Sequence, residues 1–170
     1  TGPYKDSNFA KVFKQARQAK NPDAVFLADY EPYAPSYNAP AAFIASPIFS
    51  GAELVGVAVF QMPIDRINQI MTSQNAWKDV GLGATGETYI VGDDYLMRNQ
   101  SRFLIEDREN YLNMIRSIGT SEDTIRQIET FNSSVGLQTV KTKGTVAALA
   151  GQTHTEIFPD YRGVRVLSSY

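Results

Sequence analysis

The chain has 170 residues, of which 43% are hydrophobic and 20% are charged, and its formal net charge is −2. This size and composition are typical of one ordinary globular domain or of two small lobes, and they exclude a disordered chain. The Lys and Arg residues are scattered and cysteine is absent, which argues against nucleic acid or anionic membrane surfaces as partners and excludes disulfides and thiolate metal sites.

Composition also bears on the compartment. A chain without cysteine suits the cytosol or the bacterial periplasm. The sequence contains neither an apolar run near the ~20 residues needed to cross a bilayer nor a signal-peptide pattern. If the parent protein is bound to a membrane, we therefore expect its anchors to lie outside these 170 residues.

The first forty residues predict a helix, a short strand and an aromatic loop. Residues 7–20 repeat apolar side chains at helical spacing and end at Asn21-Pro22, where the proline disfavours helix. Residues 24–27 form a short apolar strand candidate. Residues 29–40 hold three prolines and three tyrosines, which exclude a helix or an interior strand. We expect an ordered aromatic loop or an irregular edge there.

A hairpin and a helix follow. Residues 42–49 and 53–62 are rich in Ile, Val and Phe and flank a glycine-containing turn. The second run is almost continuously apolar, which predicts a central strand buried on both faces. Met62-Pro63 then predicts a helix with proline in its first turn. The expected buried stripe of this helix consists of Ile67, Ile70 and Met71.

The remainder predicts two more hairpins separated by helices. The first hairpin spans residues 87–98 and turns at Gly92-Asp93-Asp94. Residues 107–118 are helical, and Thr120 with Asp123 predicts a capping box for a further helix to Phe131. The last hairpin joins residues 153–158 and 164–170. Helices between antiparallel hairpins indicate the α+β class, with an antiparallel sheet flanked by helices, and not a doubly wound parallel sheet.

Residues 81–86 match the glycine pattern of a dinucleotide-binding loop. That loop works only after a strand and before a helix, because the pyrophosphate lies on the helix N-terminus. Here a helix precedes the glycines and a strand candidate follows them. The pattern therefore predicts a tight helix-to-strand turn.

Neither catalysis nor a metal site is indicated. His154 is the sole histidine, and no acid or nucleophile near it in sequence completes a catalytic set. The acidic pairs Asp93-Asp94 and Glu106-Asp107 lack the spacing of a calcium loop and are explained by turn and helix-end chemistry. We expect a protein that is not an enzyme and needs no cofactor or metal.

Two groups of side chains are candidates for binding a ligand. The loop residues Tyr30, Tyr33, Tyr37 and Asn38 place hydroxyl and amide groups beside apolar faces, a mixture found in small-molecule pockets. The alternative is that these tyrosines simply cover a sheet face. Arg98, Ser101 and Arg102 could clamp a carboxylate or phosphate, or could be solvated surface charges.

Three passages resemble the extracellular Cache domain, the PAS-like sensor module of bacterial methyl-accepting chemotaxis receptors and of some sensor kinases and cyclases. Residues 83–103 (GATGETYIVGDDYLMRNQSRF) are similar to the opening hairpin of such a domain. Residues 30–68, with AAFIASPI and VFQMPIDRIN, look like the closing strands of a membrane-distal lobe. Residues 160–170, with DYRG and VLSSY, resemble later strands of a membrane-proximal lobe.

The resemblance implies a truncated piece of a two-lobe sensor. Residues 1–80 would be the closing part of a membrane-distal lobe, and residues 81–170 the opening part of a membrane-proximal lobe. These parts form either two incomplete lobes or one combined sheet in a permuted order. We favour one combined sheet, because half-sheets leave exposed edges that aggregate.

The resemblance also implies a function. It predicts an extracytoplasmic sensor on the periplasmic face of the inner membrane. The parent protein would be anchored in the membrane, and a homodimer would be compatible with this role. The ligand would be a small metabolite, amine or organic acid that biases a transmembrane signalling helix. A structural or dimerisation spacer that binds no ligand is the alternative. The pattern of the amino-acid-binding subset is absent, since Trp77 lies in the wrong context. The candidate ligand-binding residues are Tyr30, Tyr33, Tyr37, Asn38, Phe43, Tyr89, Arg98 and Arg102.

Overall fold

The computed structural model describes residues 2–62 and 64–170. It divides into two compact units, Thr1–Ile64 and Asp65–Tyr170. A three-stranded antiparallel sheet, a two-stranded sheet and six α-helices lie within the described residues, which confirms the predicted α+β class. The boundary between the units falls earlier in the chain than the 80/81 boundary inferred from the sequence. The predicted proline in the first turn of the next helix, Pro63, lies outside the described residues.

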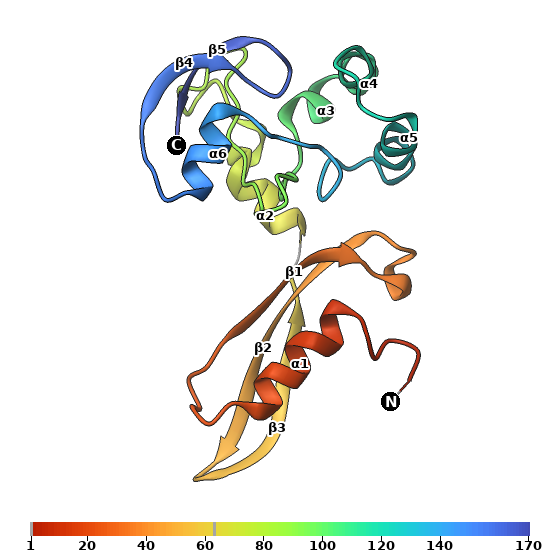
Figure 1. Ribbon diagram of the computed structural model, residues 1–170, viewed down its shortest axis with the longest axis vertical. Helices are drawn as coiled ribbons and strands as arrows, with labels where there is room; N and C mark the ends of the chain where they lie inside the picture. The colour runs from red at the N-terminus through yellow and green to blue at the C-terminus, as the bar shows by residue number, and fades with distance from the viewer. Residues whose placement is uncertain (1, 63) are drawn as a thin grey trace. The chain divides into compact units, whose positions relative to one another are not determined.

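The first unit is one helix on one sheet. Helix α1 (Asn8–Gln18) begins at Ser7, whose side chain caps the Ala10 N–H. It lies across the sheet formed by β1 (Phe26–Pro32), β2 (Pro40–Ser50) and β3 (Glu53–Gln61), in the order β1-β2-β3 (Figure 1). A 3-10 helix, η1 (Ala34–Ser36), joins β1 to β2. The buried core between the helix and the sheet consists of Val12, Ala16, Ala41, Phe43 and Ala45.

Two features of this sheet differ from the expectation. The central strand is β2, whereas β3 lies at an edge and leaves Phe60 70% exposed, so the prediction of a central strand over residues 53–62 is wrong. Its apolar residues are divided between a face that packs on α1 and a face that does not. The tyrosine- and proline-rich segment begins as strand β1, an edge strand whose register shifts between Ala28 and Glu31. The irregular edge expected there is thus confirmed.

The second unit combines short helices with irregular segments and one hairpin. It contains α2 (Ile64–Met71), the 3-10 helix η2 (Ser73–Asn75), α3 (Arg102–Glu106), α4 (Arg108–Ser117), α5 (Glu122–Phe131) and α6 (Lys143–Leu149). Strands β4 (Thr155–Pro159) and β5 (Arg165–Ser169) form the predicted hairpin. None of the described residues of α2 is buried and Ile70 is 65% exposed, so the buried stripe predicted for that helix is wrong.

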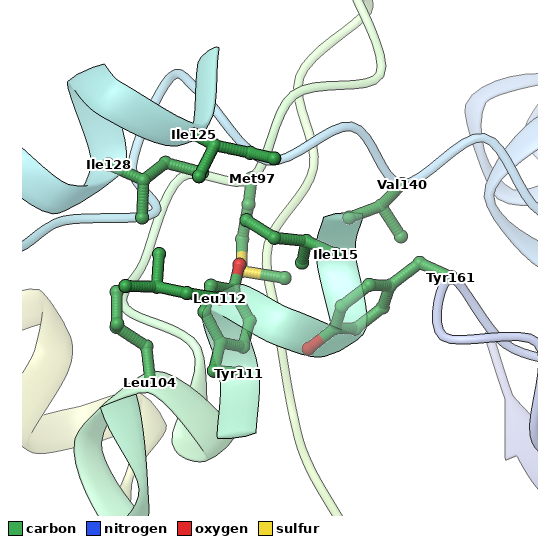
Figure 2. Packing of buried hydrophobic residues seen from close by; sticks show 9 residues of the cluster. All are labelled: Met97, Leu104, Tyr111, Leu112, Ile115, Ile125, Ile128, Val140 and Tyr161. Carbon is green, nitrogen blue, oxygen red and sulfur yellow. The ribbon is translucent and has the colours of Figure 1, made fainter. Parts of the chain in front are cut away.

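Helices α3, α4 and α5 surround an apolar core with Met97 at its centre (Figure 2). Helix α5 is capped by Ser121, whose hydroxyl accepts from the Thr124 N–H, so the predicted cap at Thr120 is displaced by one residue. The other buried members of the core are Leu104, Tyr111, Leu112, Ile115, Ile125, Ile128, Val140 and Tyr161. The aromatic side chain of Tyr161 reaches this core from the turn between β4 and β5.

The segment 87–98 turns back on itself but does not form regular strands. The Arg98 N–H donates to the Ile90 carbonyl at 2.8 Å, and the Tyr95 N–H donates to the Gly92 carbonyl at 3.0 Å. Its bridges are isolated, Val91 with Met97 and Leu96 with Thr139. The strands therefore form two separate sheets, and the expectation of one combined sheet is wrong. Strand β1 lies at one edge of the first sheet, and its shifted register makes it a poor template for pairing with another chain. The aggregation argument that favoured a combined sheet therefore does not apply to this edge.

Candidate functional site

Five of the eight candidate residues lie in the first unit. Tyr33 and Phe43 pack edge to face with ring centroids 5.0 Å apart, and Phe43 also contacts Phe9 in the core beneath α1. Tyr30 belongs to β1. Tyr37 is 92% exposed, and it and Asn38 adopt positive φ angles in the connection to β2. For Tyr33, covering the sheet is therefore the structural role that the contacts support.

The other three, Tyr89, Arg98 and Arg102, lie in the second unit, and both arginines are buried. Arg102 is 1% exposed, and its Nη1 and Nη2 donate to the carbonyls of Gly86 at 2.6 Å and Ala84 at 3.0 Å. Arg98 is 7% exposed and pairs with Asp94 at 2.8 Å. The interpretation of solvated surface charges is wrong for both: the Arg102 guanidinium binds the segment of Ala84 and Gly86, and the Arg98 guanidinium binds Asp94 and the Leu96 carbonyl within its own turn.

A pocket of about 610 Å³ lies within the second unit. One wall is the glycine-containing segment 82–91, the second is α6, and the third is β5 with the turn before it; α6 lies beside the β4–β5 hairpin in Figure 1. The volume falls in the range of small-molecule sites. Of the eight candidate residues, Tyr89 lines this pocket.

The charged groups that line the pocket are Glu87, Asp160 and Arg162. Glu87 Oε1 accepts from the Arg102 N–H at 2.7 Å and from the Ser101 hydroxyl at 2.9 Å. Its Oε2 lies within hydrogen-bond distance of the Tyr161 hydroxyl, at 2.8 Å. This carboxyl thus connects the 82–91 segment, the start of α3 and the β4–β5 turn.

Asp160 and Arg162 form a buried ion pair in the turn. Arg162 Nε donates to Asp160 Oδ2 at 2.7 Å, and the guanidinium lies 3.8 Å from the ring centroid of Phe103. Asp160 Oδ1 also accepts from the backbone N–H groups of Arg162 and Val164. The pair is desolvated and fully engaged, so it fixes the shape of the turn.

Electrostatics around the pocket reflect this burial. Desolvation raises the pKa of Glu87 above its ordinary value, although hydrogen bonds from Tyr161, Ser101 and Arg102 act in the opposite direction. Burial, together with the carboxylates of Glu87 and Asp160, raises the pKa of Tyr89 to about 12. Tyr89 is therefore a neutral phenol at physiological pH, able to donate a hydrogen bond to a ligand.

Close packing shapes the α6 wall. A Cβ at Gly144 would lie 2.5 Å from Phe158 Cζ and 3.0 Å from Tyr170 Cδ1, so α6 approaches the β4–β5 hairpin closely only because glycine occupies this position. Phe158 and Tyr170 themselves stack edge to face. Helix α6 begins at Thr142, which forms a reciprocal capping box with Thr145.

The glycines of residues 81–86 form the expected turn. Gly81 and Gly83 have positive φ angles, and the Gly86 N–H donates to the Leu82 carbonyl at 2.9 Å. Segment 87–91 that follows is not helical, so the helix N-terminus that a pyrophosphate requires does not follow this turn.

Residues 2–62 and 64–170 contain no group of three or more His, Cys, Asp or Glu side chains arranged to hold a metal ion. None of the helices within these ranges has the length and apolar character needed to cross a membrane. The arrangement offers a cavity with apolar side chains, hydroxyl groups and the carboxyls of Glu87 and Asp160, which suits binding. Comparison with family models, curated proteins and solved structures finds no match to this chain.

Proposed function

We propose that this chain is the extracytoplasmic small-molecule-sensing region of a transmembrane chemotaxis or signal-transduction receptor. The observation that carries the proposal is the pocket of about 610 Å³ in the second unit. Two of its walls, residues 82–91 and the end of the chain from Asp160, come from passages that resemble Cache domains. Sensing would take place at the periplasmic face of the inner membrane.

The pocket provides both burial and orientation for a small metabolite, amine or organic acid. Apolar side chains of Leu82, Val91 and Leu149 line it beside the hydroxyls of Thr88 and Ser168. Ligand sites typically combine an apolar surface with a few polar groups in this way. Because Glu87 and Tyr161 join the wall of residues 82–91 to the β4–β5 turn, a ligand that prefers one arrangement of these walls would shift the population toward it.

A thermal-shift screen against a library of metabolites tests the proposal. A ligand present at 100 times its Kd stabilises the folded state by about 2.7 kcal/mol, which raises the melting temperature by several degrees in a protein of this size. Ala148 lines the pocket and is exposed, so Ala148→Trp should fill the cavity and reduce affinity at least tenfold. Val146→Trp is the matched control, because Val146 lies on α6 outside the lining. Equal loss of affinity in both variants, or no shift with any compound at millimolar concentration, would contradict the proposal.

A spacer that dimerises is the second candidate, and one observation favours it. Leu27, Ile44 and Phe60 lie opposite one another across the three strands, on the face that alternation directs away from α1. Leu27 and Phe60 are exposed. Sedimentation equilibrium would show a dimer that Phe60→Glu weakens; a monomer at high micromolar concentration would rule this candidate out.

A further inference from the structure

Three oxygen-bearing groups close a ring in the second unit. The Glu87 carboxyl, the Tyr161 hydroxyl and the Ser101 hydroxyl each lie within hydrogen-bond distance of the other two. The distances are 2.8 Å from Tyr161 to Glu87 Oε2, 2.9 Å from Ser101 to Glu87 Oε1, and 2.9 Å between the two hydroxyls. Ser101 and Tyr161 are buried, and the Glu87 side chain is partly buried.

The number of protons in this ring depends on the charge of Glu87. With an ionised carboxylate, the Ser101 and Tyr161 hydroxyls each donate their single proton to an oxygen of Glu87. No proton then remains for the contact between the two hydroxyls, and their lone pairs face each other at 2.9 Å. A buried contact of that kind is unfavourable.

A neutral carboxylic acid supplies the missing proton. Glu87 Oε2–H then donates to the Tyr161 oxygen, Tyr161 donates to Ser101, and Ser101 donates to Oε1. The Ser101 oxygen also accepts from the Phe103 N–H at 3.2 Å, so its one donor and two acceptor sites are all used. The Oε1 atom has two donors, Ser101 and the Arg102 N–H, whereas Oε2 has one partner, as expected for a carbonyl oxygen and a hydroxyl.

We propose that Glu87 is held as a neutral carboxylic acid in the folded protein, where its proton completes a closed ring of three hydrogen bonds with Tyr161 and Ser101. Desolvation by burial acts in the same direction on its pKa. The other titratable or charged groups near this carboxyl are Arg162, which favours the ionised form, and Tyr89, Tyr111 and Tyr161, whose own pKa values Glu87 raises. The Arg102 guanidinium is directed to the carbonyls of Gly86 and Ala84.

The ring has a consequence for the pocket that it borders. With Glu87 neutral, the remaining charged pocket residues are the Asp160–Arg162 pair, whose charges cancel. Loss of the Glu87 proton would add a negative charge to the lining and break the ring at the turn that carries Tyr161. The effect of this charge on ligand binding rests on the proposed function, whereas the protonation state of Glu87 does not depend on it.

The direct test is a carbon-detected NMR titration of the Glu87 side-chain carboxyl in the full 170-residue chain. We expect the carboxyl to remain protonated at neutral pH, since its pKa is raised above 4.5, the ordinary value for a glutamate. A carboxyl that is ionised at neutral pH would overturn the proposal. The experiment requires no ligand, so its failure is distinguishable from failure of the proposed function.

The isosteric variant Glu87→Gln gives a second test through stability. A carboxyl with a raised pKa stabilises the folded state at low pH, and this stabilisation is lost as pH rises through the folded-state value. The stability of Glu87→Gln relative to wild type should therefore increase as pH rises from 4.5. A decrease in this relative stability over the same range would show that the hydrogen bonds of the ring stabilise the ionised form of Glu87. The matched control is Glu156→Gln, because hydrogen bonds from Lys143 and Tyr170 lower the pKa of Glu156. Its stability relative to wild type should decrease as pH rises toward 4.5 and stay level above that value.

Discussion

The two compact units satisfy their buried polar groups in different ways. In the first unit, backbone groups pair in the ladders between β1, β2 and β3, and the buried polar side chain is Asn8. In the second unit, side chains bond to the backbone of irregular segments, and the buried set includes Arg98, Asn99, Ser101, Arg102, Ser134 and Gln138. The pocket lies in the second unit. Loops that are fixed by buried side chains can present backbone polar groups to a ligand, whereas in a regular sheet these groups are already paired between strands.

The largest expected effect is the loss of Arg102. Its guanidinium binds two loop carbonyls, pairs with Glu106 at 3.0 Å and lies 4.7 Å from the ring centroid of Trp77. Arg102→Met would leave both carbonyls and the acid without their donor, at a cost of about 3–5 kcal/mol in the free energy of unfolding. Urea denaturation measures this cost.

The control for that experiment is Arg126→Met in the same unit. Arg126 pairs with Asp123 on the surface, and exposed pairs contribute about 0–1 kcal/mol. If both variants lose the same small amount, buried side chains do not hold the loops of the second unit, and the contrast between the units fails.

A smaller effect is expected from the corresponding group of the first unit. Asn8 Nδ2 donates to the carbonyls of Asp29 at 2.8 Å and Ala41 at 2.6 Å, and so connects α1 to β1 and β2. Asn8→Ala removes this donor from buried positions and should cost about 1–3 kcal/mol. Urea denaturation beside Gln15→Ala, an exposed residue of the same helix, checks it; equal stabilities would show that the sheet alone fixes α1.

How far the sequence predicts the structure follows the same division. Apolar runs on either side of a glycine-containing turn reveal the hairpins of residues 42–62 and 153–170. Helical periodicity reveals α1 and α4, and a capping pattern reveals α5. Helices α3 and α6 escape detection because they are short, and the side-chain caps Ser101 and Thr142 mark their starts better than apolar spacing does. Strand order is also hidden, since an apolar run such as β3 suits an edge as well as a centre.

The pocket could not be predicted from local patterns. Glu87 and Tyr161 are 74 residues apart, and each lies in a segment whose composition indicates only a strand or a turn. In the sequence, Asp160 and Arg162 look like ordinary turn residues, and nothing near them indicates that they form a buried ion pair. Arg98 and Arg102 are buried and bind carbonyl and carboxylate groups of the chain itself, and such burial cannot be read from their neighbours in sequence.

A change in the turn that borders the pocket should have an intermediate effect. Gly163 has a φ angle of 78°, and its N–H donates to the Asp160 carbonyl at 2.9 Å. Gly163→Ala should cost about 1–2 kcal/mol, since side chains disfavour this conformation. Gly56→Ala in β3 is the matched control, because Gly56 has no positive φ and its nearest neighbour would be Ile48 Cδ1 at 3.7 Å. Thermal melts measure both variants. If Gly163→Ala and Gly56→Ala melted at the same temperature, this turn would not be rigid.

The smallest effect concerns the surface of the same hairpin and depends on pH. Glu156 accepts hydrogen bonds from Lys143 on α6 and from the Tyr170 hydroxyl at 2.6 Å, and these bonds lower the pKa of the Glu156 carboxyl. A lowered pKa means that the ionised group stabilises the folded state above pH 4.5 and that this contribution is lost as pH falls through the folded-state value. Lys143→Met should therefore reduce stability slightly at pH 7 and leave it unchanged in acid strong enough to protonate the wild-type Glu156 carboxyl. Added salt at pH 7 should shrink the difference, because the pair is exposed to solvent. A difference that persisted at low pH would indicate that Lys143 acts through packing of its aliphatic stem against the hairpin. Side-chain contacts would then hold the surface of the second unit together as they do its interior.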